Sequence, residues 1–236
     1  MDNYTSLKQE CYEANMLLPK LGLVVYTFGN VSAADRSAGV LAIKPSGVPY
    51  ETLKWRDMVI VSIEKGCVID GSLRPSSDTE THAVLYRNFD NIGGIAHTHS
   101  IYAAAWAQAL KSVPVYGTTH ADHLVCDIPC TEIMGDEKIK GGYEEETGYQ
   151  IVDKFKNSCL NPDEVEMVLV ASHGPFTWGK SADKAVYNSK VLEELCKMAL
   201  FTQQLDDSAK RMKNSLIQKH YERKHGLNAY YGQGNK

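Results

Sequence analysis

Ile92-Gly-Gly-Ile-Ala-His97-Thr-His99-Ser100 is a short apolar run that ends in two histidines one residue apart. Alternate residues of an extended strand point to the same face, so such a strand end can direct two imidazoles at one point. A zinc ion binds two such nitrogens at about 2.0–2.1 Å and requires further ligands. The alternative is that both histidines are ordinary surface or core residues.

A second stretch repeats this design further along the chain. The apolar, β-prone run Val165-Glu-Met-Val-Leu-Val-Ala171 stops at Ser172-His173-Gly174-Pro175. Two buried strands would therefore deliver His97, His99 and His173 at their ends. Three protein ligands with an open position are typical of a catalytic metal, whereas a closed set of four is typical of a structural one.

The composition is that of a soluble globular protein. The 236 residues are 43% hydrophobic and 23% charged, with a net charge of −4. This balance offers no basic patch for nucleic acid or an anionic membrane, so we expect small molecules or copies of the same chain as partners. The N-terminus does not resemble a signal peptide, and no run of 18 apolar residues occurs, so we expect a cytoplasmic protein with reduced cysteines.

Hydrophobic periodicity and turn residues predict intermixed helices and strands. We expect strands at 23–26, 31–33, 39–43, 58–63, 67–70, 92–97, 165–171 and 176–178, and helices at 7–18, 78–89, 102–110, 147–158, 182–204 and 208–224. Ser77 and Glu80 fit a capping box at the start of the second helix. Between 113 and 143 the signal is weak. We expect a single α/β domain spanning 1–236, a three-layer α/β/α sandwich with a mixed, mostly antiparallel sheet.

Small polar turns are candidates for phosphate binding. They are Gly29-Asn30, Ser46-Gly47 and Ser76-Ser77, and Lys44 and Arg74 stand beside two of them. Free backbone N–H groups in glycine-containing turns and at helix N-termini bind anions well. The alternative is that these are only turn and cap residues.

Two more clusters carry ionisable groups. In Thr119-His120-Ala121-Asp122-His123 the carboxylate could be a metal ligand, a hydrogen-bond orienter or an acid/base group, and the residues alone leave all three open. The tail from Lys219 and His220 to Tyr230-Tyr231-Gly232 ends in two tyrosines. By itself that tail would be interpreted as a frayed surface segment.

Seven motifs together, in this order, resemble those of the epimerase branch of the class II aldolase/epimerase family. They are Gly29-Asn30, Ser46-Gly47, Ser76-Ser77-Asp78, His97-Thr-His99, His120-Ala-Asp122-His123, Ser172-His173-Gly174 and Asn228-Ala-Tyr230-Tyr231-Gly-Gln. The resemblance implies a three-layer sandwich that assembles as a C4 homotetramer.

The resemblance also implies a function for each motif. His97, His99 and His173 would bind Zn²⁺, with Asp78 as a possible fourth ligand. The substrate and phosphate site would comprise Gly29, Asn30, Lys44, Ser46, Gly47, Ser76 and Ser77. Asp122 and Tyr231 would be the acid/base pair, the tyrosine reaching in from a neighbouring subunit, with His220 in the same site.

The implied reaction is epimerisation at C4 of a ketopentose phosphate by cleavage and re-formation of the C3–C4 bond. In the aldolase members a glutamate occupies the position of Asp78, so the shorter side chain favours the epimerase. The alternatives are an aldolase that releases its fragments, a zinc hydrolase, another divalent metal, and a non-catalytic ligand-binding protein on the same fold. Arabinose, ascorbate and other pentose routes could all use such an enzyme.

Overall fold

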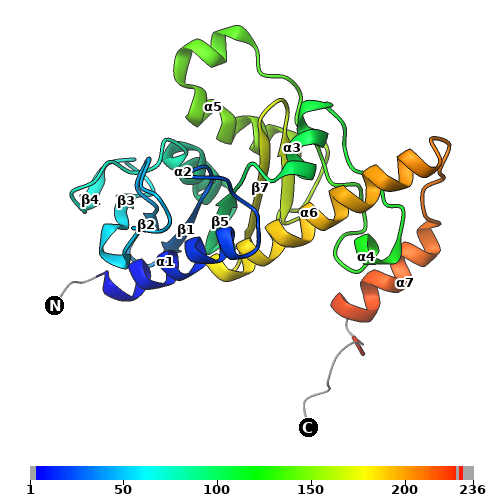
Figure 1. Ribbon diagram of the computed structural model, residues 1–236, viewed down its shortest axis with the longest axis horizontal. Helices are drawn as coiled ribbons and strands as arrows, with labels where there is room; N and C mark the ends of the chain where they lie inside the picture. The colour runs from blue at the N-terminus through cyan, green and yellow to red at the C-terminus, as the bar shows by residue number, and fades with distance from the viewer. Residues whose placement is uncertain (1–3, 227–228, 231–236) are drawn as a thin grey trace.

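The computed structural model describes residues 4–226 and 229–230, and its centre is a seven-stranded sheet (Figure 1). The strands follow the spatial order β4-β3-β2-β1-β5-β7-β6, and every neighbouring pair is antiparallel. Their bounds are β1 Asn30–Asp35, β2 Val40–Ile43, β3 Val59–Ser62, β4 Val68–Asp70, β5 Gly94–His97, β6 Met167–Val170 and β7 Gly174–Gly179. The predicted α/β class with a mostly antiparallel sheet is confirmed.

Helices cover both faces of this sheet (Figure 1). Their bounds are α1 Thr5–Lys20, η1 Trp55–Asp57, α2 Thr79–Asn88, α3 Ile101–Gln108, α4 Thr118–Ala121, α5 Asp136–Asn157, α6 Ala182–Leu205 and α7 Asn214–His225. None of the helices in the described part of the chain combines the length and apolar character that crossing a membrane requires.

The strand pleat divides the buried side chains between two cores. On β2, Leu41 and Ile43 join the core beneath α2 and α5, whereas Val40 and Ala42 join the core beneath α1 and the start of α6. This alternation is expected of a strand buried on both faces, because successive side chains point to opposite sides. The result is a three-layer arrangement of helix, sheet and helix.

Several boundaries differ from the sequence-based predictions. Residues 23–26 form no strand: Leu23 packs beneath α1, and Tyr26 has a φ of 54°, which an extended strand excludes. The capping box is also wrong, because Asp78 is the N-cap of α2 and its side chain makes no capping hydrogen bond. The last helix starts at Asn214 rather than 208, and α5 starts at Asp136, inside the weak region.

Candidate metal centre and phosphate pocket

The sheet register places the two histidine stretches next to each other. His97 is the last residue of β5 and lies opposite Asn30 of β1 on one side and Phe176 of β7 on the other. His173 lies in the tight turn between β6 and β7, where Ser172 adopts a φ of 59°. Because β7 pairs directly with β5, this turn lies beside the end of β5 and brings His173 to the H-x-H pair.

The three histidines form a compact group of nitrogen ligands. One ring nitrogen from each of His97, His99 and His173 lies within 4.8 Å of the other two. Nε2 of His97 is 3.1 Å from Nε2 of His99, while Nδ1 of His97 lies 3.0 Å from the carbonyl oxygen of Pro175. If Nδ1–H donates to that carbonyl, Nε2 keeps its lone pair for an ion. The donor set therefore fits a divalent metal such as zinc.

Burial favours the neutral form of two of these imidazoles, His99 and His173. Burial and, next, the neighbouring His97 lower the pKa of His173 to about 3, although Asp78 opposes the shift. The pKa of His99 is lowered by the same two causes. Neutral imidazole is the form that binds a metal, so the site is prepared for one at neutral pH.

Asp78 and Asn30 form the polar wall beside the histidines. Burial raises the pKa of Asp78, but His97, His82 and a hydrogen bond from Asn30 outweigh it, so the pKa is lowered overall. Nδ2 of Asn30 donates to Oδ2 of Asp78 at 2.6 Å and to Oγ of Ser76 at 3.1 Å. The buried Oδ1 of Asn30 has no hydrogen-bond partner in the structure, so it can accept from a bound hydroxyl.

Backbone hydrogen bonds hold two of the predicted phosphate turns side by side. The Ser46 N–H donates to the Arg74 carbonyl at 2.9 Å, and the Ser76 N–H donates to the Lys44 carbonyl at 3.0 Å. The Lys44 side chain is only 2% exposed, and its Nζ lies 4.8 Å from the centre of the Tyr50 ring. Burial lowers the pKa of Lys44 to about 8. A buried ammonium beside two serine turns is well suited to an anion.

These groups line one pocket of about 370 Å³, which we call the histidine pocket. Its lining residues are Thr27, Phe28, Gly29, Asn30, Lys44, Pro45, Ser46, Gly47, Ser76, Ser77, Asp78, His97, His99, Tyr143, Glu144 and His173. Every residue predicted for metal and phosphate binding is among them, whereas Arg74 is not. Gly29 is needed for close approach, because its φ is +85° and a Cβ there would lie 2.8 Å from the His97 carbonyl oxygen.

Two polar residues of this pocket were not predicted from the sequence. Tyr143 and Glu144 belong to α5 and stand at the end of the weak region 113–143, where no motif or spacing distinguished them. Their place in the pocket depends on how α5 packs on α2, which only the tertiary structure specifies. Glu193 of α6 was also missed: its carboxylate accepts the backbone N–H groups of Tyr102 and Ala103 just after His99.

Asp122 lies outside the histidine pocket in a group that we call the Asp122 cluster, made of Asp122, His220, Arg223 and Lys224. Nδ1 of His220 is 2.9 Å from Oδ1 of Asp122, and the Arg223 guanidinium donates to both carboxylate oxygens at 3.0 and 2.7 Å. Burial raises the pKa of Asp122, but hydrogen bonds from Arg223 and His220 and the charge of Lys224 lower it to about 2. Helix α4 packs against α7 here, at the end of the molecule away from β4 (Figure 1).

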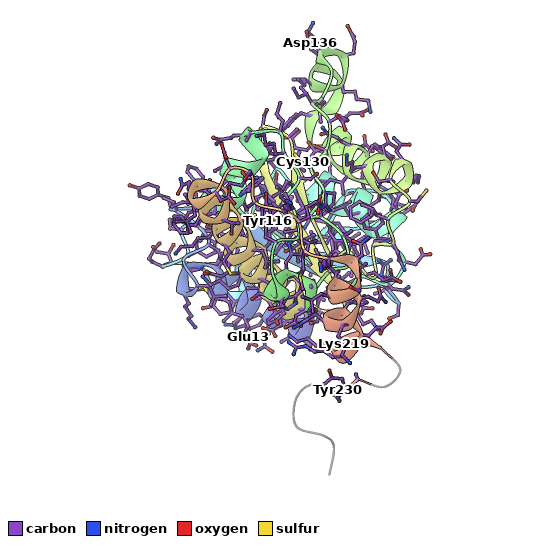
Figure 2. The ribbon with its side chains drawn as sticks, turned by 90° about the vertical axis from the view of Figure 1, so that its right-hand side faces the viewer. Glu13, Tyr116, Cys130, Asp136, Lys219 and Tyr230 are labelled. Atoms are coloured by element: carbon purple, nitrogen blue, oxygen red, sulfur yellow. The ribbon has the colours of Figure 1, made fainter. Side chains whose placement is uncertain are left out.

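The tail beyond α7 starts next to this cluster. The backbone N–H of Tyr230 donates to the Arg223 carbonyl at 3.0 Å, and Nζ of Lys219 lies 5.5 Å from the centre of the Tyr230 ring (Figure 2). Tyr231, the predicted proton carrier, lies outside the described residues. Its neighbour Tyr230 lies close to the Asp122 cluster, because its backbone N–H binds Arg223 of that cluster.

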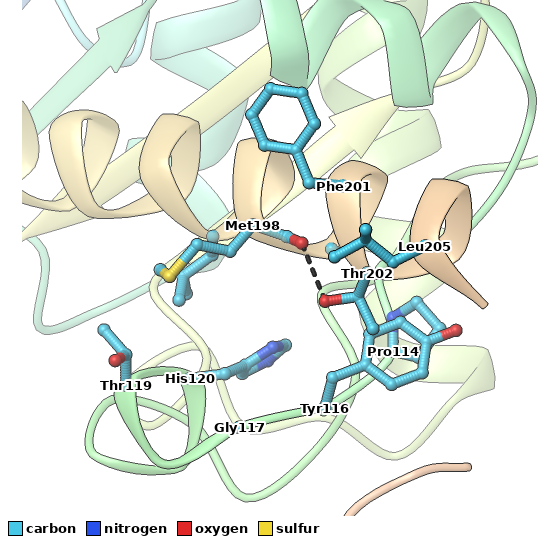
Figure 3. A pocket seen from close by; sticks show the side chains of 11 residues that line it. Pro114, Tyr116, Gly117, Thr119, His120, Met198, Phe201, Thr202 and Leu205 are labelled. Atoms are coloured by element: carbon cyan, nitrogen blue, oxygen red, sulfur yellow. Dashed lines mark hydrogen bonds between the residues drawn. The ribbon is translucent and has the colours of Figure 1, made fainter. Parts of the chain in front are cut away.

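His120 lines a different pocket. This mainly apolar pocket of about 360 Å³ lies between Met198 and Thr202 of α6 and the segment that carries Tyr116 and His120 (Figure 3). Nε2 of His120 is 3.1 Å from the Cys126 carbonyl oxygen. Among the described residues, the metal-binding geometry is met by His97, His99 and His173 alone, so nothing in this part of the chain supports Asp122 as a metal ligand.

Comparison with known proteins agrees with this architecture. The family described as "Class II Aldolase and Adducin N-terminal domain" matches residues 9–200. Among solved structures, an L-fuculose 1-phosphate aldolase has a TM-score of 0.79 at 23% identity, covering 92% of this chain and 95% of its own. YgbL of Klebsiella pneumoniae, titled a putative aldolase/epimerase/decarboxylase, has a TM-score of 0.69 at 22% identity, covering 91% and 97%. At these identities the structures support the fold, and the family match shows that the chain belongs to the class II aldolase and adducin family.

Proposed function

We propose that the protein is an L-ribulose-5-phosphate 4-epimerase, which interconverts L-ribulose 5-phosphate and D-xylulose 5-phosphate. The observation that carries the proposal is that three clustered imidazoles and a buried lysine flanked by serine turns line one pocket. Such a pocket can hold both ends of a small sugar phosphate, its oxygen-rich carbon chain at the histidines and its phosphate at Lys44.

The chemistry explains why both ends must be held. C4 of the ketopentose is not adjacent to the carbonyl, so simple deprotonation does not readily invert it. Cleavage of the C3–C4 bond, rotation of the aldehyde fragment and re-formation of the bond achieve the inversion. A divalent ion held by His97, His99 and His173, for which zinc is our candidate, would supply Lewis acidity for this cleavage.

The residues at the phosphate end would retain the aldehyde fragment while it rotates. Lys44 offers an ammonium group, and Ser46 and Ser76 offer hydroxyls beside the N-terminus of α2. The free Oδ1 of Asn30 would accept a hydrogen bond from a substrate hydroxyl. Asp78 lies beside the histidines as a possible further ligand, and its carboxylate is ordered by Asn30.

Proton transfer at the C4 oxygens would come from a second copy of the chain. Asp122 and His220 contact each other but do not line the histidine pocket of their own chain. A C4 homotetramer would bring the Asp122 cluster and the tail with Tyr231 of one copy to the pocket of the next. A carrier on each side of the aldehyde would serve one epimer each.

The second candidate is an aldolase that releases its two fragments. The structural similarity to an L-fuculose 1-phosphate aldolase favours it, over 92% of this chain. The aspartate at position 78, where those aldolases are expected to carry glutamate, favours the epimerase.

The test is to incubate the purified, metal-loaded protein with L-ribulose 5-phosphate and follow the products by NMR. Formation of D-xylulose 5-phosphate without accumulation of free fragments supports the epimerase. Accumulation of dihydroxyacetone and glycolaldehyde phosphate would identify the aldolase. If the metal-loaded protein does not convert L-ribulose 5-phosphate at all, the result supports the alternative of a non-catalytic ligand-binding protein.

A further inference from the structure

Tyr143 contacts one of the three histidines of the pocket. Its hydroxyl oxygen lies 3.2 Å from Nδ1 of His173. In the same way, Nδ1 of His97 lies 3.0 Å from the carbonyl oxygen of Pro175. Two of the three imidazoles thus have Nδ1 engaged by a neighbour outside the histidine group, one through the main chain and one through a side chain.

The protonation of the imidazole determines the direction of this contact. A ring nitrogen that binds a metal must offer its lone pair, so the proton of a neutral ring lies on the other nitrogen. Since Tyr143 engages Nδ1 of His173, Nε2 is the nitrogen left for an ion. The Nδ1–H of His173 then donates to the Tyr143 oxygen, as that of His97 donates to Pro175.

The packing of α5 holds Tyr143 in place. Gly142 has non-helical backbone angles and divides the helix, and the part before it projects from the molecule as far as Asp136 (Figure 2). The part after it is fixed to α2: Oγ1 of Thr81 donates to the Glu144 carbonyl at 2.5 Å. At Gly148 the two helices touch so closely that a Cβ would lie 2.6 Å from Cβ of Val84. The hydroxyl is therefore presented by a rigid element.

We propose that Tyr143 is a positioning residue that orients His173 and selects its metal-binding tautomer. The inference rests on the proposed metal site and adds a residue that neither motif nor spacing indicated. Outer partners of this kind usually change metal affinity by about 10–100-fold when they are removed. The effect belongs to the protein without substrate, because the contact is made to the imidazole itself.

The experiment compares Tyr143→Phe with Tyr149→Phe. Both tyrosines lie on α5 and both are 38% exposed, but Tyr149 does not line the pocket. Each full-length protein is stripped with a chelator, and its affinity for Zn²⁺ and Co²⁺ is measured by competition with a chromophoric chelator in the absence of substrate. We expect Tyr143→Phe to bind about 10–100-fold more weakly and to show an altered Co²⁺ absorption spectrum. We expect Tyr149→Phe to bind as wild type does.

Two further measurements make the result decisive. The thermal midpoints of the metal-free proteins should agree, because Phe keeps the ring and the side chain loses only its hydroxyl at a partly exposed position. His97→Asn is included as the reference for loss of the site. If His97→Asn loses the metal while Tyr143→Phe binds with wild-type affinity, the positioning role is wrong and the metal site stands. If His97→Asn also binds normally, the proposed metal site itself is wrong.

Discussion

The histidine pocket and the Asp122 cluster differ in how complete they are within one chain. The pocket gathers residues from the ends of β1, β2 and β5 and from the turn before β7. The start of α2 and the middle of α5 supply the others. The cluster is built from two short helices, α4 and α7, and its carboxylate is already paired with Arg223 and Lys224 of its own chain. In the function proposed above, ligand binding is built into one copy, whereas proton transfer requires a surface that a second copy must meet.

The ionisable groups of the two regions also differ in their charge. Burial lowers the pKa of His99 and His173 and so favours the neutral form, in which they bind an ion. Asp122 has the opposite character, since its cationic partners lower its pKa to about 2 and keep it ionised at neutral pH. A carboxylate held so firmly is a weak base, so we expect contact with the neighbouring copy to change its surroundings before it can accept a proton efficiently.

The largest effect is expected from removing a pocket histidine. His97→Asn and His173→Asn each leave only two of the three imidazoles. We expect the affinity for the metal to decrease by more than about 100-fold, which exceeds the effect of losing an outer partner. Metal analysis of the purified proteins measures this. His120→Asn is the matched control, because His120 lines the apolar pocket instead. Full metal occupancy in a folded His97→Asn protein would place the metal elsewhere.

Asp122→Asn should separate the two regions. It keeps the size of the side chain and removes the ionisable group, so we expect normal metal content and a decrease of about 10²–10⁴-fold in epimerisation. Slow condensation of dihydroxyacetone with glycolaldehyde phosphate should remain, with one C4 configuration favoured, and Tyr231→Phe should favour the other. Unbiased products together with depleted metal would show instead that Asp122 supports the metal site.

Lys44 should give phosphate binding a characteristic pH dependence. Its pKa is lowered to about 8 by burial, so the charged form is present below that pH and is lost as the pH rises through it. We expect the affinity for inorganic phosphate to decrease about tenfold between pH 7 and pH 9, following the charged fraction. Calorimetry on wild type, Lys44→Met and the exposed-site control Lys65→Met tests this. A bound anion raises the pKa of Lys44, so a midpoint somewhat above 8 is consistent, but equal affinity in Lys44→Met is not.

The residues that the sequence could predict are those whose neighbours follow from local pattern. The H-x-H at the end of an apolar strand and the repeat of that design at His173 predicted the metal group, because sheet pairing joins strand ends. The serine turns were also predictable, since glycine and serine determine the turn chemistry. Tyr143 and Glu144 were not, because their approach to the pocket depends on the kink at Gly142 and on the docking of α5 against α2.

Boundaries failed where tertiary contacts override local preference. The apolar run 23–26 has strand composition, but Leu23 is buried under α1 and the chain turns sharply at Tyr26. The residues alone left open three roles for Asp122, and the structure explains why they could not decide. Its partners are about 100 residues away on α7, a contact that no periodicity encodes.

The smallest effect, and the most direct test of the comparison, comes from mixing two inactive variants. If the pocket of one copy works with the Asp122 cluster of the next, His97→Asn and Asp122→Asn chains mixed at equal amounts should regain about a quarter of wild-type activity, since half of the pockets and half of the clusters are intact. Native mass spectrometry confirms that hybrids form.

Mixing His97→Asn with His173→Asn is the control, because both defects lie in the pocket and no site becomes whole. Asp122→Asn mixed with Tyr231→Phe tests whether the aspartate and the tyrosine act from one copy or from two: with both on one copy, the mixture stays inactive. Activity in that last mixture would mean that the aspartate and the tyrosine act from different copies. Hybrids of His97→Asn and Asp122→Asn without activity would mean that pocket and cluster work within one chain.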